Sequence, residues 1–156
     1  MTGAHKPSTE FPAGIMAARE IDAFLEDLFP QAHTGGKVMQ VEAAGTNGAR
    51  IRLVAHEKNL RPGNTLSGPS MFQLADFGMY VAILATLGTS AVQAVTTNLN
   101  ITFLSRPVFA DLIAEVRLIR VGRRLVVGEV EMVSIETGEM VAHAVATYAL
   151  PSKHMG

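Results

Sequence analysis

The chain has 156 residues, of which 48% are hydrophobic and 17% charged, and it contains no cysteine. A chain of this length can form one domain with its own core, and the apolar content excludes a mainly disordered state. The net charge is −1, so we expect no nucleic-acid partner, which would need a strongly basic face. The lack of cysteine excludes disulfides, thiolate metal sites and cysteine nucleophiles.

The two ends of the sequence are polar. We expect flexible tails at residues 1–11 and 151–156, with a single domain at 12–150 between them. The N-terminal segment has no apolar run that could act as a signal peptide. The longest apolar stretch, Met71 to Leu87, contains Asp76 and is shorter than the ~20 residues of a membrane span. We therefore expect a cytoplasmic protein without a membrane partner.

The first half of the chain predicts a helix, a hairpin and a loop. Apolar residues at three- and four-residue spacing predict a helix at about 12–29, ended by Pro30. Alternating residues on both sides of Asn47-Gly48 predict a β-hairpin with a type I′ turn. Residues 60–69 contain Pro62-Gly63 and Gly68-Pro69 and are predicted to be a loop.

The second half predicts one buried helix followed by strands. Residues 70–87 are apolar on nearly every side of a helix, and Gly88 is placed to end it. Strands are predicted at about 95–103, 109–121, 124–135 and 140–150. These elements indicate an α+β fold in which a curved antiparallel sheet of five or six strands wraps the long central helix.

Two strands have side-chain patterns that make specific predictions. In the first, Thr96, Asn98, Asn100 and Thr102 form a polar row opposite an apolar face. If this strand is a sheet edge, pairing with a second subunit would protect its backbone groups, whereas the simpler interpretation is a row that faces solvent. In the last strand every second residue from Ala142 to Ala146 is alanine, so we expect a wide element to pack there.

Asp76 is the one charged residue in the apolar helix. Burying an unpaired carboxylate costs several kcal/mol, so Asp76 must be paired, hydrated or at a cleft. It can act as a base or nucleophile beside an apolar wall. The alternative is a buried aspartate bonded to the backbone or to a neighbouring subunit.

Ser67-Gly68-Pro69 precedes the helix. The free N–H groups of a first helical turn stabilise anions, and Gly68 would let a ligand approach the backbone closely. The alternative is an ordinary capped helix start.

These residues resemble a known family. Leu66-Ser67-Gly68-Pro69 followed by Met71–Asp76 resembles the hotdog-fold acyl-CoA thioesterases of the phenylacetate-pathway (PaaI-like) type, which have His-Gly-Gly and then Leu-Ala-Asp, with the Asp nine residues after the His. Residues 94–104 and Gly122-Arg123-Arg124-Leu125 are similar to the family's next strand and turn. The resemblance covers about residues 38–150. It implies a hotdog fold, dimers that pair edge to edge, and hydrolysis of acyl-CoA thioesters to free acid and CoA.

The resemblance also implies site residues. Asp76 matches the catalytic carboxylate, as general base or nucleophile, and Gly68 the glycine whose N–H polarises the thioester carbonyl. Thr96 stands where a Ser or Thr helps to place the water or the carboxylate. Gly68 and Asp76 are eight residues apart, which is ~12 Å along a helix. A thioester carbonyl can therefore lie between them only across a dimer interface or through a bend.

The sequence departs from the family at the helix start. Ser67 replaces the His, and Pro69 replaces the second Gly and has no N–H. Arg61 occupies the position of an Asn that is six residues before the His, and Asn59 and Asn64 are nearby but out of register. We expect Ser67, Arg61 and Asn64 to contact the substrate.

Charged residues late in the chain suggest a phosphate site. Arg123 and Arg124 lie in a predicted turn and are expected to bind the phosphates of CoA, unless they form a solvated surface. The histidines lack metal-ligand spacing, so we expect no metal and no cofactor apart from CoA as part of the substrate. The low charge and the edge strand predict a homodimer or homotetramer.

Two other functions stay open. A non-catalytic acyl-CoA-binding module is favoured by Ser67. An enoyl-CoA hydratase or dehydratase would need a His with an acidic partner, and neither His56 nor His143 has an obvious one in the sequence. Met71, Phe72, Met79 and Tyr80 suggest a pocket for medium-chain or aromatic acyl groups.

Overall fold

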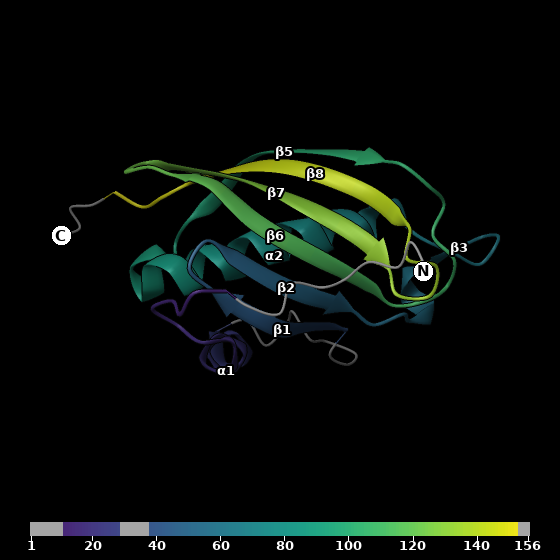
Figure 1. Ribbon diagram of the computed structural model, residues 1–156, viewed down its shortest axis with the longest axis horizontal. Coiled ribbons are helices and arrows are strands. Elements are labelled where there is room, and N and C mark those ends of the chain that lie inside the picture. The colour runs from purple at the N-terminus through teal and green to yellow at the C-terminus, as the bar shows by residue number, and fades with distance from the viewer. Residues whose placement is uncertain (1–10, 29–37, 153–156) are drawn as a thin grey trace.

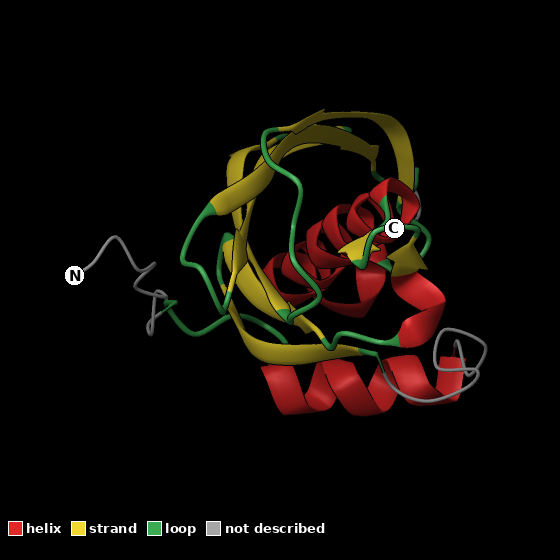
Figure 2. Ribbon diagram, turned by 90° about the vertical axis from the view of Figure 1, so that its right-hand side faces the viewer, coloured by secondary structure: helices red, strands yellow, loops and turns green. Residues whose placement is uncertain are grey.

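A computed structural model describes residues 11–28 and 38–152. The predictions for residues 1–10, for Pro30 and for 153–156 lie outside the described residues. The described chain forms a six-stranded antiparallel sheet in the order β1-β2-β6-β7-β8-β5, which curves around one long helix (Figures 1 and 2). The predicted α+β hotdog architecture is confirmed.

The elements have the following bounds. The helices are α1 (Ala18–Leu28) and α2 (Gly68–Leu87), with single 3₁₀ turns at Glu57–Asn59 and Gly88–Ala91. The strands of the large sheet are β1 (Met39–Gly45), β2 (Gly48–Leu53), β5 (Val95–Phe103), β6 (Leu112–Val121), β7 (Leu125–Ser134) and β8 (Met140–Ala149). The short strands β3 (Leu60–Arg61) and β4 (Thr65–Leu66) pair with each other.

The helix α2 is enclosed because the sheet presents small residues to it. Ala142, Ala144 and Ala146 of β8 have no exposed surface and share the core with α2, which is the wide element expected there. Gly78 brings the helix against β6: a Cβ at this position would lie 2.8 Å from Cγ2 of Val116. By length and composition Gly68–Ala91 could cross a membrane, so the expectation that the apolar stretch is too short is wrong. In this structure most of the stretch is buried in the hydrophobic core, against the sheet.

The first helix begins later than predicted. Residues 12–17 are not helical and run across the C-terminal end of α2, where the N–H groups of Ile15 and Met16 both donate to the carbonyl of Ala85 (2.7 and 3.3 Å). A Cβ at Gly14 would lie 2.3 Å from that oxygen, so only glycine permits this approach. The N–H of Ala17 donates to the carboxylate of Glu20 (2.8 Å), which caps the start of α1.

The β1–β2 hairpin has a different turn from the predicted one. Gly45 pairs with Gly48, so the loop residues are Thr46 and Asn47. Asn47 has a positive φ of 65°, but its neighbours do not, whereas a type I′ turn needs two such residues. The turn is docked: the N–H of Asn47 donates to Oγ1 of Thr86, and its carbonyl accepts from the N–H of Leu118. These tertiary contacts explain the altered turn.

The predicted loop at 60–69 contains local structure. The β3–β4 hairpin turns through Gly63 and Asn64, both with positive φ. Ser67 is the N-cap of α2, so the helix starts at Gly68 rather than Ser70. Gly88 ends the helix with a positive φ of 78°, as predicted.

A β-bulge in β5 changes which face Thr96 occupies. Thr96 pairs with Tyr148 and Asn98 with Thr147, so Thr97 is an extra residue. Thr96 therefore points inward with Tyr148, and the predicted polar row that joined it to Asn98 is wrong at this position. The strand β5 is an edge of the sheet, which confirms that premise of the dimer prediction.

The outer face of the sheet carries ion pairs between neighbouring strands. Glu129 on β7 accepts from Arg117 on β6, and its Oε1 lies 3.1 Å from Nε2 of His143 on β8. The hydrogen bond from His143, assisted by Arg117, lowers the pKa of Glu129 against the opposing effect of desolvation. A lowered folded-state pKa stabilises the fold above the unfolded value of about 4.3, and this contribution is lost as the pH falls through the folded value.

We predict that Gly78→Ala destabilises the protein by about 1–3 kcal/mol, because the new methyl group overlaps Val116. This loss exceeds the gain of about 1 kcal/mol in helix propensity. Urea unfolding monitored by circular dichroism measures the change. Gln73→Ala, at an exposed position of the same helix, is the control and should change stability by less than about 0.5 kcal/mol. Equal stability of Gly78→Ala and the wild type would contradict the close helix–sheet contact.

We also predict that Glu129→Gln flattens the loss of stability in acid. Wild type should lose stability as the pH falls below about 4.3, because a lowered carboxyl pKa resists protonation only in the folded state. The measurement is the urea midpoint at pH 6 and at pH 3. Glu136→Gln, at an exposed turn position, should keep the wild-type pH dependence. Identical acid profiles for all three proteins would show that the Glu129 ion pairs do not stabilise the fold.

Candidate functional site

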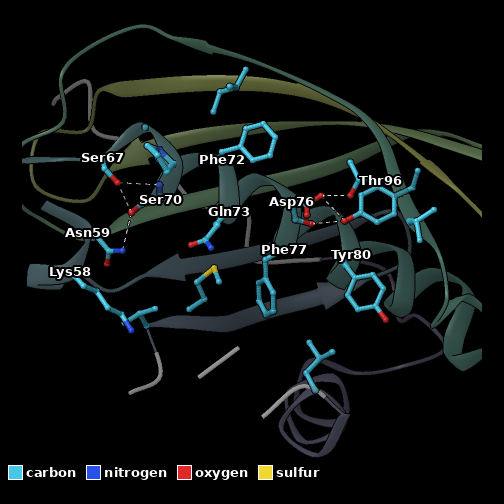
Figure 3. A pocket seen from close by; sticks show the side chains of 18 of the residues that line it. Lys58, Asn59, Ser67, Ser70, Phe72, Gln73, Asp76, Phe77, Tyr80 and Thr96 are labelled. Carbon is cyan, nitrogen blue, oxygen red and sulfur yellow. Dashed lines mark hydrogen bonds between the residues drawn. The ribbon is translucent and has the colours of Figure 1, made fainter. Parts of the chain in front are cut away.

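A large pocket runs along one face of α2. Its volume is about 1740 Å³, larger than the roughly 300–1,000 Å³ of most small-ligand pockets. The helix contributes side chains at the spacing of a single face: Phe72, Gln73, Asp76, Phe77 and Tyr80. The other walls come from α1, β1, β5, β8 and the segment before β3 (Figure 3).

One oxygen of the Asp76 carboxylate is fixed and the other is not. Oδ1 accepts hydrogen bonds from Oγ1 of Thr96 (2.6 Å) and from the hydroxyl of Tyr148 (2.7 Å). Within the described residues no hydrogen bond reaches Oδ2. Asp76 is half-buried and lines the pocket. Its carboxylate is held by side chains rather than by backbone donors, which leaves Oδ2 available to a ligand or a water.

The sequence analysis missed Tyr148. Burial raises the pKa of the Tyr148 hydroxyl, and the charge of Asp76 raises it further, so the group is a protonated donor at neutral pH. Its ring stacks on Tyr80 with 6.4 Å between centroids. The alternation of β8 could have identified it. Tyr148 follows Ala142, Ala144 and Ala146 at every second position, so it faces inward with them and is the one aromatic residue in that row.

The start of α2 forms a second polar cluster. The hydroxyl oxygen of Ser67 accepts from the N–H of Ser70 (3.2 Å) and lies 2.8 Å from Oγ of Ser70. Nδ2 of Asn59 donates to the same Ser70 oxygen (2.9 Å), and the carbonyl of Asn59 accepts from the N–H of Ser67 (2.7 Å). Gly68 is the first helical residue, so its N–H has no acceptor within the helix.

The two clusters lie at separate points along the pocket. Figure 3 shows Ser67 and Ser70 on one side, Asp76 and Thr96 on the other, and Gln73 between them. The helix α2 is one uninterrupted α-helix over 20 residues, so no bend brings Gly68 and Asp76 together. The bend that the sequence left open is therefore excluded, and a site shared across a dimer interface stays a prediction.

The structure brings together most of the predicted site residues. Arg61, Ser67, Gly68, Asp76 and Thr96 line the same pocket. Asn64 does not, because its left-handed conformation places it in the β3–β4 turn. Arg123 and Arg124 lie outside the pocket too, in the exposed link between β6 and β7.

The apolar wall differs from the prediction. Phe72 and Tyr80 line the pocket, but Met71 and Met79 are buried in the core beneath the sheet, so their predicted role is wrong. Additional apolar residues come from other elements, namely Leu25, Val38 and Met39. Sequence periodicity within α2 could not reveal these contributions, because they depend on how α1 and β1 pack.

His143 has an acidic partner, but the pair lies away from the pocket. His143 contacts Glu129 on the outer face of the sheet, an acidic partner that is not obvious in the sequence, and neither residue lines the pocket. Across residues 11–28 and 38–152 no group of three or more metal-binding side chains gathers.

Comparison with known proteins defines the class. The model of the thioesterase superfamily matches residues 63–141, about half of the chain. The chain belongs to the thioesterase superfamily, which supports thioester hydrolysis as its general reaction. A search of curated proteins finds no match.

Solved structures support this assignment. A proposed thioesterase from Silicibacter sp. TM1040 is 38% identical, with a TM-score of 0.80 over 89% of this chain and 94% of that one. Zebrafish thioesterase superfamily member 2 is 18% identical, with a TM-score of 0.74 over 87% and 99%. A variant of the phenylacetic acid degradation protein PaaI from Thermus thermophilus is 21% identical, with a TM-score of 0.65 over 83% and 100%. The latter two share the fold.

We predict that Tyr148→Phe destabilises the protein by about 1.5–3 kcal/mol, because a half-buried carboxylate loses a donor. Tyr80→Phe is the matched control: its hydroxyl donates to the neutral carbonyl of Val92, so the loss should be about 0.5–1.5 kcal/mol. Urea unfolding at pH 7 measures both. A smaller effect at Tyr148 than at Tyr80 would argue against an ionised Asp76 that depends on this bond.

Proposed function

We propose that this protein hydrolyses acyl-CoA thioesters to the free acid and CoA, in the manner of the PaaI-like hotdog enzymes that its helix motif resembles. The observation that carries the proposal is the Asp76 carboxylate. One oxygen is held by Thr96 and Tyr148, while the other is left for chemistry in a pocket that also contains a helix N-terminus. Fixing one oxygen sets the direction of the other, as a general base or nucleophile requires.

The proposed reaction divides the work between the two clusters. The N–H of Gly68 polarises the thioester carbonyl and stabilises the oxyanion that develops on it. Asp76 removes a proton from water as the water oxygen attacks the carbonyl carbon. The carbon–sulfur bond then breaks and the leaving sulfur takes this proton from Asp76, which gives the free acid and the CoA thiol and restores the carboxylate. Direct attack by the carboxylate, followed by hydrolysis of the resulting anhydride, uses the same arrangement. Thr96 and Tyr148 orient the carboxylate in both cases.

A homodimer would complete this site. Asp76 contacts Thr96 at the start of β5, and the ring of Phe103 at the end of β5 lies beside Gly68. The helix α2 therefore runs opposite to β5. If the edge strand β5 pairs antiparallel with β5 of a second copy, a two-fold axis near the strand centre brings the Asp76 end of one subunit to the Gly68 end of the other. Such pairing bridges the ~12 Å between the two clusters and forms two equivalent sites, in a dimer or in a tetramer of such dimers.

The pocket walls suggest which residues contact the acyl group and which contact the CoA portion of the substrate. Leu25, Val38, Met39 and Phe77 form an apolar region, which suits an uncharged acyl group such as a medium-chain or aromatic one. Arg61 lines the pocket near the helix start and is a candidate contact for the CoA portion.

Arg123 and Arg124 are candidates for the CoA phosphates outside the pocket. Leu125 pairs with Ala149, which also pairs with Val95 beside the pocket. Two strand spacings correspond to roughly 10 Å, a distance that an extended nucleotide could span. Asn64, in the exposed turn before the helix start, would contact the substrate only at the rim.

The departures at the helix start favour one alternative. Pro69 provides no N–H, and Ser67 stands where the family has a histidine. A protein with these changes could bind acyl-CoA without hydrolysing it.

We predict that Asp76→Asn lowers the rate of thiol release from acyl-CoA by roughly 100-fold or more, because the amide is neither a base nor a nucleophile. The measurement is the rate of free-thiol appearance with a panel of straight-chain and aromatic acyl-CoAs. Asp27→Asn, at an exposed position of α1, is the control and should retain wild-type rates. Thermal melting checks that both variants fold.

The same panel separates the two functions. Thermal stabilisation by acyl-CoA without thiol release from the wild type would support the binding module and refute the hydrolase. Turnover that is unchanged in Asp76→Asn would remove Asp76 from the mechanism.

A further inference from the structure

Hydrogen bonds link Ser67 to Ser70, and Ser70 to Asn59. Nδ2 of Asn59 donates to Oγ of Ser70 (2.9 Å), so the hydroxyl proton of Ser70 must go elsewhere. The hydroxyl oxygen of Ser67 lies 2.8 Å from that of Ser70, and either hydroxyl can donate to the other. The Ser67 oxygen also accepts from the N–H of Ser70 (3.2 Å). A serine hydroxyl accepts two hydrogen bonds and donates one, so when the Ser70 hydroxyl is the donor, both acceptor positions of Ser67 are filled and its own proton is left to donate.

The orientation of the Asn59 amide determines the direction of the hydrogen bond between Asn59 and Ser70. Asn59 is only 7% exposed and lines the pocket, and its Oδ1 has no donor among the described residues. Rotating the amide by 180° would instead bury an NH₂ group without acceptors. Buried N–H groups without an acceptor are rarer than buried carbonyl oxygens without a donor. The amide therefore donates to Ser70. When Ser70 in turn donates to Ser67, the proton of Ser67 points away from Ser70.

The position of that proton coincides with a missing donor. At the start of α2 the backbone offers the N–H of Gly68, but Pro69 in the next position has none. Ser67 and Gly68 are adjacent and both line the pocket. When Ser70 is the donor in its contact with Ser67, no hydrogen bond within the described part of the chain uses the Ser67 proton, and the pocket is where its acceptor would come from.

We infer that Ser70 donates to Ser67, and that Ser67 is a catalytic residue whose hydroxyl donates a second hydrogen bond to the thioester oxygen, beside the N–H of Gly68. Ser70 and Asn59 are positioning residues that keep its proton directed at the substrate. The serine thereby replaces the donor that the proline removes. During attack, negative charge develops on the thioester oxygen while the proton stays on Ser67, so the residue stabilises charge without transferring a proton. This inference rests on the proposed hydrolysis.

The test compares Ser67→Gly with Ser67→Thr. Glycine at an N-cap lowers helix stability by only a few tenths of a kcal/mol relative to serine, so this variant removes the hydroxyl while keeping the helix start. Threonine keeps both the cap and the hydroxyl. We expect kcat for thiol release to fall about 100-fold in Ser67→Gly, with KM changed less than about threefold. Ser67→Thr should stay within about fivefold of the wild type, since its donor remains.

A second variant tests the positioning role. Ser70→Ala keeps the backbone N–H that bonds to Ser67 but removes the hydroxyl that fills its other acceptor position. We expect kcat to fall about tenfold with KM unchanged, because the Ser67 proton is no longer directed to the substrate. A lower melting temperature with unchanged kcat would overturn the positioning role of Ser70.

The outcomes separate this inference from the proposed function. If the wild type releases thiol, Asp76→Asn does not, and Ser67→Gly retains the wild-type kcat, the inference on Ser67 is wrong while the hydrolase proposal stands. If Ser67→Gly and Ser67→Thr lose kcat equally, the hydroxyl is not the cause and the inference is also wrong. If the wild type releases no thiol from any acyl-CoA in the panel, both fall together.

Discussion

The enclosure of α2 by the curved sheet is the constraint on which the rest of the molecule depends. The helix is apolar on nearly every side, and the sheet can close around it because Gly78 and the alanines of β8 remove the side chains that would hold the two apart. Burial is favourable on all sides except the one that carries Asp76, since a carboxylate cannot be buried unpaired without a large loss of free energy. The pocket lies along that side, so the packing of the core and the location of the site have the same cause.

The site depends on two features that orient a single carboxylate oxygen. The bulge at Thr97 turns Thr96 inward, and the end of the alanine row places Tyr148 beside it, so both hydroxyls reach Oδ1 of Asp76. Neither feature belongs to the helix. The second cluster, at Asn59, Ser67 and Ser70, is organised by a 3₁₀ turn that leads back to the helix start. The chemistry is thus spread over three segments that only the fold brings together.

Features that depend on residues close together in the sequence could be predicted from it, and features set by distant contacts could not. Hydrophobic period and local caps predicted α2, its end at Gly88, the strands and the position of Asp76, because these depend on neighbours within a few residues. The late start of α1, the turn at Asn47 and the inward direction of Thr96 were not predictable, because each is set by a contact far away in sequence. The pocket wall shows the same division: Phe72 and Tyr80 follow from the helix, whereas Leu25 and Met39 come from elements whose packing a one-dimensional pattern does not contain.

The segment that crosses the end of α2 has an electrostatic consequence. A helix carries a partial positive charge of roughly half an elementary charge at its N-terminus and an equal negative one at its C-terminus. Ile15 and Met16 donate to the carbonyl of Ala85, and the N–H of Gly88 to that of Leu84, so the chain itself supplies donors to carbonyls at the negative pole. At the positive pole the N–H of Ser70 donates to Oγ of Ser67, but the N–H of Gly68 has no acceptor within the helix and Gly68 lines the pocket. The helix therefore presents a fixed, one-sided field that favours any ligand whose oxygen gains negative charge there.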